Sequence, residues 1–220
     1  MRKIVLLVLS LFVFSFSNAQ LQLGLKFSPQ MSLGRTLLSD DARDFEADDP
    51  GFKFALGLMV DYGFAENYFF STGVSFMPKR VAFLISNEDG SSLPAGVNPF
   101  EDYNVQYLQV PLSLKLYTNE IQPDMKIFFQ VGAAPEVKIY DQPVDEDYDL
   151  VEEFQFIDAA AILGVGIEIK VGLNTALVGG FSYQRGLVNQ LRTLNSNGIN
   201  FQEDPSYRNT IVSLDLGIKF

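Results

Sequence analysis

Hydrophobic and polar residues alternate along most of this chain. Between Leu21 and Leu33 the odd positions are mostly apolar, and the even positions between them are polar or small. A period of two over this length indicates a β-strand, and the run is longer than strands usually are in soluble domains. The same pattern returns in seven further segments, at residues 52–64, 68–76, 108–117, 126–139, 158–170, 175–187 and 212–220. This repetition predicts a sheet with one apolar face and one polar or small face.

The links between these segments alternate between short and long. Residues 65–67, 118–124 and 172–174 form short links, whereas residues 34–51, 86–102, 141–155 and 188–207 form long polar ones. Short turns on one side and long loops on the other are typical of outer-membrane barrels, whose short turns face the periplasm. We therefore predict an all-β fold, an eight-stranded antiparallel transmembrane β-barrel of the outer-membrane type. An even number of strands then places both termini on the periplasmic side.

The properties of lipid explain why such a sheet should close. Lipid offers the backbone no hydrogen-bond partner, so a membrane-spanning sheet must pair its first strand with its last. Tilted strands of about ten residues cross the hydrocarbon core, and most of these segments reach that length. We expect the aromatic residues near the segment ends to form two interfacial girdles. The first comprises Phe64, Tyr68, Phe69, Tyr117, Phe128 and Phe220, and the second comprises Phe52, Phe76, Tyr107, Tyr140, Phe156 and Tyr183.

The first residues have the composition of an export signal. Arg2 and Lys3 precede an almost unbroken apolar run at residues 4–16. This run is shorter than the ~20 residues that a spanning helix needs, and it has the length of the apolar part of a signal peptide. An uncleaved membrane anchor is the alternative reading of the same run.

The residues after this run suit a cleavage site. Ser17 and Ala19 are small and stand three residues and one residue before Gln20, which is the pattern that signal peptidase requires. We predict a cleaved signal peptide at residues 1–19 and an outer-membrane β-barrel domain at residues 20–220.

The amino-acid composition argues against most classes of enzyme. The chain contains no histidine and no cysteine, and its formal net charge at pH 7 is −11. Without imidazole, neutral-pH acid–base catalysis and most zinc centres lose their usual side chain. Without cysteine there is no disulfide scaffold, and an acidic chain lacks the basic surface that nucleic acids require. We predict a protein that is not an enzyme, has no catalytic residues and no cofactor, and does not bind nucleic acid.

The polar face of the predicted barrel carries charges of both signs. Eight strands enclose an interior that side chains just fill, and buried charges are tolerated when they are paired. We therefore interpret these residues as a lumenal polar network, in preference to a conduction pathway or a catalytic site. Its predicted members are Lys26, Lys53, Asp61, Lys115, Glu136, Asp158, Glu168, Lys170, Asp215 and Lys219.

Three prolines conflict with a closed barrel, which has no free edge strand for them. Bulges near the rim would accommodate Pro29 and Pro135, whereas Pro111 lies deeper and has no such explanation. The apolar phase also changes between Tyr107 and Leu108, which predicts a β-bulge at that point.

The first and third long loops are strongly acidic. In the third, Asp145, Asp147 and Asp149 occupy every other position, and clustered carboxylates are the ligands that calcium prefers. The stretch lacks the central glycine and terminal glutamate of a helix-loop-helix site. These aspartates are therefore weak calcium candidates. The favoured alternative is a solvated loop whose carboxylates repel one another. No other metal site is predicted.

The chain ends with alternating apolar residues and a final aromatic, Phe220. This ending is similar to the terminal strand that the barrel-insertion machinery reads, so we predict that Phe220 is part of an insertion signal. The same residues also suit a strand that closes the barrel, and the two roles are compatible. The expected partners are outer-membrane lipid and the insertion machinery.

Several features together resemble the PorT-like outer-membrane β-barrel family of Bacteroidetes-type bacteria. They are the region around Asn18, Ala19 and Gln20, the stretch from Tyr107 to Leu112 that leads to Lys115, and the glycine-rich later segments. The resemblance covers the whole mature chain and includes Pro111. It implies a component of the type IX secretion and gliding apparatus, with secretion-system proteins as possible partners, and it implies no catalytic residues.

The leading functional prediction is a non-enzymatic barrel that supports protein secretion of the type IX or gliding type, or envelope assembly. The alternative is a surface adhesin or interaction barrel that acts through its acidic extracellular loops. A small channel and an outer-membrane enzyme rank below these two, because a filled interior conducts poorly and barrel enzymes characteristically use a histidine.

Overall fold

A computed structural model describes residues 20–37, 43–87, 91–93, 98–144, 150–194 and 205–220. The predicted signal peptide and the calcium candidates Asp145, Asp147 and Asp149 lie outside these residues. The strands are β1 (Gln20–Leu37), β2 (Arg43–Ala47), β3 (Gly51–Ala65), β4 (Tyr68–Asn87), β5 (Phe100–Gln109), β6 (Leu112–Tyr117), β7 (Met125–Pro143), β8 (Val151–Phe154), β9 (Ile157–Lys170), β10 (Ala176–Gly186), β11 (Leu191–Leu194) and β12 (Ser206–Lys219). Helices long and apolar enough to cross a membrane are absent from the described segments.

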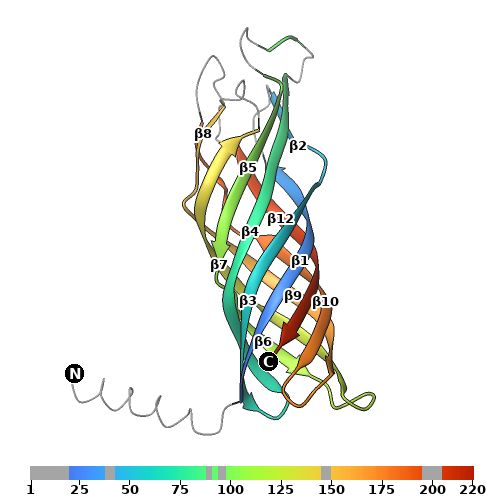
Figure 1. The fold of residues 1–220 in the computed structure, drawn as a ribbon. Helices are drawn as coiled ribbons and strands as arrows, with labels where there is room; N and C mark the ends of the chain where they lie inside the picture. The colour runs from blue at the N-terminus through green and yellow to red at the C-terminus, as the bar shows by residue number, and fades with distance from the viewer. Residues whose placement is uncertain (1–19, 38–42, 88–90, 94–97, 145–149, 195–204) are drawn as a thin grey trace, which may run out of the picture.

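The strands close into a ring. Antiparallel pairing joins β1 to β3, β3 to β4, and β4 to both β5 and β6. β5 and β6 pair with β7, and the ring continues through β9, β10 and β12 back to β1. Since β5 and β6 share one position in the ring, this is the predicted eight-stranded antiparallel barrel (Figure 1).

The two ends of the barrel differ in their connections. Short links join β3 to β4, β6 to β7 and β9 to β10 at the end where β1 begins and β12 finishes (Figure 1). We call this the short-turn end. The opposite end, which we call the long-loop end, carries the longer connections together with β2, β8 and β11.

The outer wall of the barrel is apolar. On β3, for example, Phe54 is 52% exposed whereas the next residue, Ala55, is 1% exposed. The same alternation leaves apolar side chains exposed on all the strands of the ring, including Leu23, Leu58, Val74, Leu114, Val131, Val165, Phe181 and Leu214. A continuous apolar surface of this extent is stable where lipid covers it, and it agrees with the predicted pattern.

The predicted aromatic girdles are only partly correct. Phe69, Tyr107, Tyr117 and Phe128 do not face outward, because they belong to strand positions that point into the barrel. Tyr117 and Phe128 form a buried cluster against which Phe69 packs, and Tyr107 is fully buried. Phe76 is half-buried, and the other predicted girdle residues are exposed: Phe52, Phe64, Tyr68, Tyr140, Phe156, Tyr183 and Phe220.

Pro111 lies in an interruption of the sheet between β5 and β6, and Pro135 of β7 lies beside this interruption on the neighbouring strand. The pairs Ser75–Gln109 and Ser71–Ser113 on either side keep one register, so Pro111 stands opposite Gly73. On the other side, the amide of Val110 donates to the Pro135 carbonyl at 3.0 Å. Each proline removes one donor, and the strand continues without a bulge.

The prediction of rim bulges for Pro29 and Pro135 is therefore wrong for Pro135, and it is also wrong for Pro29. The β1–β12 register is the same before and after Pro29, between the pairs Phe27–Leu216 and Gln30–Ser213. The bulge predicted between Tyr107 and Leu108 is not in β5. A register shift occurs beside Tyr107, but the extra residue is Ile139 on β7, between the pairs Gln106–Tyr140 and Tyr107–Lys138. Tyr107 itself keeps the inward phase of β5.

Candidate functional site

At the short-turn end of the interior, two lysines pair with two carboxylates from four strands. Lys219 Nζ lies 2.5 Å from an oxygen of Asp61 and 2.6 Å from an oxygen of Glu168. Lys115 Nζ lies 2.9 Å from Asp61, and the Tyr117 hydroxyl donates to Glu168 at 2.7 Å. All five residues are buried. The four charges cancel. Glu168 receives two donor groups, and Asp61 receives three because the Ser71 hydroxyl also donates to it.

A smaller polar group occupies the middle of the barrel. Lys26 on β1 lies 3.7 Å from Asp215 on β12, and the Ser28 hydroxyl donates to the same carboxylate at 2.6 Å. A cavity of about 30 Å³, lined in part by Lys26, Lys115, Gln130 and Asp215, lies beside this polar group. A space of that size holds about one or two water molecules.

Towards the long-loop end, one lysine holds two carboxylates together. Lys79 Nζ pairs with Glu136 and lies 3.2 Å from Asp158, and all three side chains are at most 1% exposed. Gln109 donates an amide hydrogen bond to Glu136 at 2.7 Å, and Gln190 donates one to Asp158 at 2.6 Å. These amides satisfy carboxylate oxygens that a single ammonium group cannot reach, as burial of charge requires.

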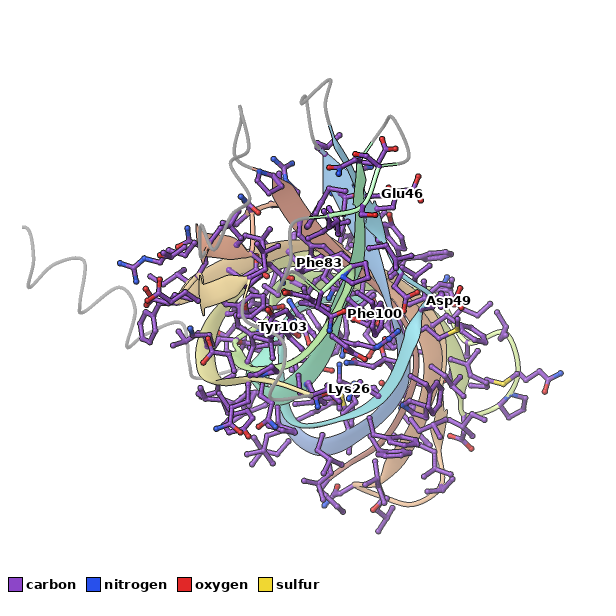
Figure 2. All side chains as sticks on the ribbon, turned by 90° about the horizontal axis from the view of Figure 1, so that it is seen from above. Lys26, Glu46, Asp49, Phe83, Phe100 and Tyr103 are labelled. Carbon is purple, nitrogen blue, oxygen red and sulfur yellow. The ribbon has the colours of Figure 1, made fainter. Side chains whose placement is uncertain are left out.

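An apolar plug fills the barrel beyond Lys79. Phe83 and Tyr103 project towards the barrel axis, as Figure 2 shows from above. β8 and β11 form a separate two-stranded sheet at the long-loop end, and Phe154 of β8 meets Tyr103 with ring centroids 5.2 Å apart. The plug consists of Phe45, Ala55, Met77, Val81, Phe83, Ile85, Tyr103, Val105, Tyr107, Leu150, Val151, Phe154, Leu191, Tyr207 and Ile211. Paired charges and this plug together close the interior.

Eight of the ten predicted network residues come together in these ion pairs: Lys26, Asp61, Lys115, Glu136, Asp158, Glu168, Asp215 and Lys219. Lys170 lies elsewhere, because it is exposed at the short-turn end. Lys53 donates to Asn104 at 2.5 Å, a residue on the outer face of β5. Its side chain can pass between β3 and β4 because these strands do not pair on the long-loop side of the Leu56–Phe76 pair.

Lys79 is the network residue that the sequence pattern did not reveal. The predicted strand ended at Phe76, whereas β4 continues to Asn87. The outward residues beyond Phe76 are Pro78 and Arg80, so the apolar alternation stops while the strand goes on. The signal that remained was the inward series Met77, Lys79 and Val81, which keeps the period of two.

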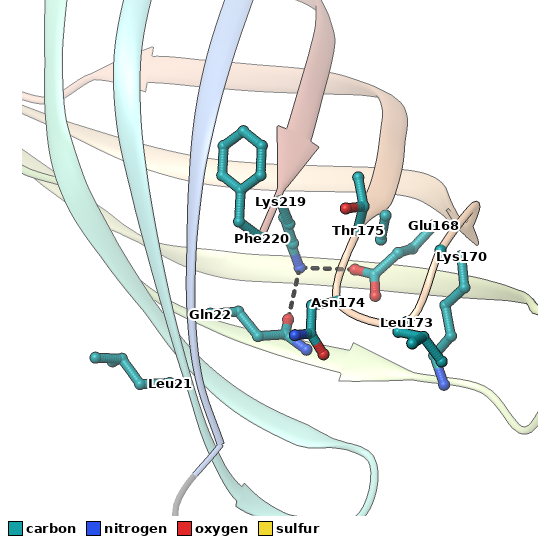
Figure 3. Close-up of a pocket in the computed structure, with 11 residues that line it drawn as sticks. Leu21, Gln22, Glu168, Lys170, Leu173, Asn174, Thr175, Lys219 and Phe220 are labelled. Carbon is teal, nitrogen blue, oxygen red and sulfur yellow. Dashed lines mark hydrogen bonds and ion pairs between the residues drawn. The ribbon is translucent and has the colours of Figure 1, made fainter.

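A pocket of about 410 Å³ opens at the short-turn end beside the C-terminus (Figure 3). Lys170 and Leu173 lie at its rim, and Glu168 and Lys219 lie deeper. Lys219 donates to Gln22 at 3.4 Å and pairs with Glu168, as the dashed lines show. The pocket therefore ends at the ion-paired network and is a mouth of the closed interior.

Among the described residues, no group of three or more histidine, cysteine, aspartate or glutamate side chains could hold a metal ion. The carboxylates that do approach one another inside the barrel are already occupied by lysines and amides. The predicted calcium candidates stay a prediction, since the described residues do not include them.

The sequence also carries a family signature. The family described as "Outer membrane protein beta-barrel domain" matches residues 15–192, which is most of the chain. The chain belongs to this outer-membrane β-barrel family. The apolar wall, the closed ring and the asymmetric ends described above are therefore those of an outer-membrane protein.

Solved outer-membrane structures are similar to this chain at low sequence identity, and OprG shows the same fold. OprG from Pseudomonas aeruginosa superposes with a TM-score of 0.57 and 10% identity over 90% of this chain and 95% of that one. Neisserial surface protein A has a TM-score of 0.48 and 11% identity over 92% and 98% of the two chains. Ail of Yersinia pestis has a TM-score of 0.39 and 13% identity over 91% and 99%. Curated proteins gave no match.

Proposed function

We propose that this barrel is a non-enzymatic outer-membrane component that supports protein secretion of the type IX or gliding type, or envelope assembly. The observation that carries the proposal is the closed interior, where Lys79, Glu136 and Asp158 are buried beneath an apolar plug. A barrel filled in this way has no room to pass a substrate, so its function belongs to its ends and its outer wall. The resemblance to PorT-like barrels supports the secretion role.

In this proposal the short-turn end faces the periplasm and meets other secretion or assembly components. Its exposed groups include Lys170 and the fully exposed Leu173, which project from the β9–β10 turn beside the pocket of Figure 3. A periplasmic partner would contact these groups without entering the barrel.

Deletion of the gene tests this role. We expect a null strain to lose export of surface proteins and to regain it when the full chain is supplied in trans. Crosslinking and pull-down from intact outer membranes should then recover secretion components. Unchanged export in the null strain, with an intact envelope, would overturn the proposal.

Conductance measurements test the closed interior separately. Purified full-length protein in planar bilayers is expected to give no conductance steps, because the paired charges and the plug leave no continuous aqueous path. Regular single-channel steps would favour a channel instead.

The exposed acidic side chains at the long-loop end favour one second candidate, a surface adhesin or interaction barrel. Asp44, Glu46, Asp49 and Glu152 are exposed there. Their replacement by Asn or Gln should abolish surface binding and leave the folded barrel intact if this candidate is correct. Normal binding by the substituted protein would exclude it.

A further inference from the structure

Three arginines lie together on the outer wall near the long-loop end. Arg35 on β1 and Arg208 on β12 are directly paired across the ladder, and Arg185 on β10 pairs with Thr210, two residues from Arg208. Side chains at such opposite and diagonal positions lie within reach of one another. Three neighbouring strands therefore bring three guanidinium groups to one patch.

All three side chains point away from the interior. Tyr207 and Asn209 are buried inside the barrel on either side of Arg208, and the inward Gln184 precedes Arg185. Alternation along a strand then directs both arginines outward. Arg35 follows the inward Gly34, whose missing side chain would meet Tyr207.

The side chain of Arg35 also extends towards Arg185. Arg35 Nη2 donates to the carbonyl of Gly186 at 3.2 Å, so this side chain reaches across β12 to the residue that follows Arg185. Like charges in direct opposition destabilise a sheet. Such a cluster is stable when an anion lies among the charges.

The described part of the chain does not supply that anion. Within it, none of the three arginines forms an ion pair, although the chain is acidic overall, with a formal net charge of −11. Other basic groups at the same end are paired: Arg80 binds Asp48 and Asp102, and Arg192 binds Glu153.

Two polar atoms on the outward face of β12 also lack a hydrogen-bond partner among the described residues. Arg208 Nε and Ser206 Oγ are buried, and neither has a hydrogen-bond partner among the described residues. They stand two residues apart on β12 and on its outward side. A buried donor without a partner costs free energy, and an oxygen-rich anion between them would satisfy both.

The height of the patch on the wall identifies the anion. Arg185 is the next outward residue after Tyr183, which ends the apolar face of β10 together with Phe181. Arg208 lies two outward positions beyond the exposed Val212, and Arg35 two beyond Met31. The patch thus lies at the edge of the continuous apolar belt, with the exposed Leu37 and Leu187 just beyond it, which is near the level of lipid headgroups.

We propose that Arg35, Arg185 and Arg208 bind the phosphate groups of an anionic lipid headgroup in the leaflet around the long-loop end. Guanidinium groups match phosphate oxygens with paired, charge-assisted hydrogen bonds. The lipid's acyl chains lie along the exposed Tyr183 and Phe181 below. This site is independent of any secretion role.

Native mass spectrometry of the full chain in a zwitterionic detergent tests the proposal with lipid A, phosphatidylcholine and inorganic phosphate as three separate probes. We expect a lipid A adduct on the natural protein. A triple variant, Arg35→Gln, Arg185→Gln and Arg208→Gln, should bind about a thousandfold more weakly, at roughly tenfold for each of the three guanidinium groups. Arg192→Gln, which removes a paired arginine at the same end, should bind normally.

Heat-modifiable migration on gels shows whether each variant is folded. If the triple variant does not fold, the single Arg185→Gln variant replaces it, because this exposed side chain has no hydrogen bond among the described residues, and roughly tenfold weaker binding is expected. The site would be overturned if the arginine variants of the patch bound lipid A as tightly as the natural protein does. It would also be overturned if the natural protein bound phosphatidylcholine as tightly as lipid A. Inorganic phosphate binding as tight as lipid A binding would overturn the lipid as its ligand.

Discussion

Lys79 is a single residue on which a large part of the interior depends. Its ammonium group neutralises Glu136 and Asp158 where neither carboxylate has contact with solvent. Removing one partner of a buried ion pair leaves charge without compensation and costs about 3–5 kcal/mol. We expect Lys79→Met to lower the free energy of unfolding by about this amount, measured by urea unfolding in detergent micelles.

Lys170→Met is the matched control, because this lysine is exposed at the short-turn end, and we expect a change within ~0.5 kcal/mol. Adding Glu136→Gln and Asp158→Asn to Lys79→Met should recover most of the lost stability, since the buried charges are then gone. A Lys79→Met protein as stable as the control would contradict the role assigned to this residue.

Gly73 gives a second prediction at the scale of one residue. It adopts φ of 151° opposite Pro111, and an added Cβ would lie 2.0 Å from the carbonyl oxygen of Leu58. We expect Gly73→Ala to destabilise the barrel by at least about 1–3 kcal/mol, because the backbone conformation alone costs that much. Thermal unfolding measures it.

Gly179→Ala provides the comparison for Gly73, since an added Cβ at Gly179 meets nothing within 4 Å. This variant should be as stable as the natural protein or slightly more stable. Equal melting temperatures for the two variants would show that the conformation of Gly73 imposes no constraint.

At the scale of elements, the ring of strands could be predicted because lipid and lumen impose opposite chemistry on successive residues. That contrast marks β1, β3 and β12 along most of their length. It fails at the upper half of β4, where Pro78 and Arg80 interrupt the apolar face. The alternation of apolar and polar residues therefore cannot show how far a strand continues beyond the lipid.

The plug could not be predicted for a different reason. β8 and β11 have four residues each, which is too short for a periodic signal, and their apolar residues lie within polar stretches. Only tertiary packing against Phe83 and Tyr103 gives them an ordered place. The charges of the network were easier to predict than their partners, because the identity of a residue limits its chemistry but not its contacts.

The pairing of β8 with β11 leads to a third prediction. Glu153 and Thr193 face each other across this small sheet, and the chain has no native cysteine to interfere. We expect the Glu153→Cys, Thr193→Cys protein to form an intramolecular disulfide under mild oxidation, detected by mass spectrometry. A Glu152→Cys, Thr193→Cys pair should form it less readily, because Glu152 is not the residue opposite Thr193. Equal yields would contradict the observed register.

At the scale of the whole molecule, Phe220 allows assembly into the membrane to be tested separately from the stability of the folded barrel. Its backbone amide donates to the Leu23 carbonyl at 2.8 Å and helps to close the barrel, but its side chain is 58% exposed. We expect Phe220→Ala to reduce the folded fraction in outer membranes while the purified, refolded barrel keeps its natural unfolding midpoint. The comparison variant Phe181→Ala, also exposed, should assemble normally. Loss of stability in refolded Phe220→Ala would instead assign the residue a packing role.

The ion pairs at the short-turn end have a consequence for the order of folding. Lys219 lies on β12, the strand that closes the ring against β1, and it neutralises Asp61 on β3 and Glu168 on β9. Before β12 arrives, these two carboxylates face a lumen that must stay hydrated. Arrival of the last strand expels that water and completes the network in one event. We therefore expect the barrel to close late and cooperatively, and we expect a variant that lacks the last residues of β12 to remain a hydrated, open sheet.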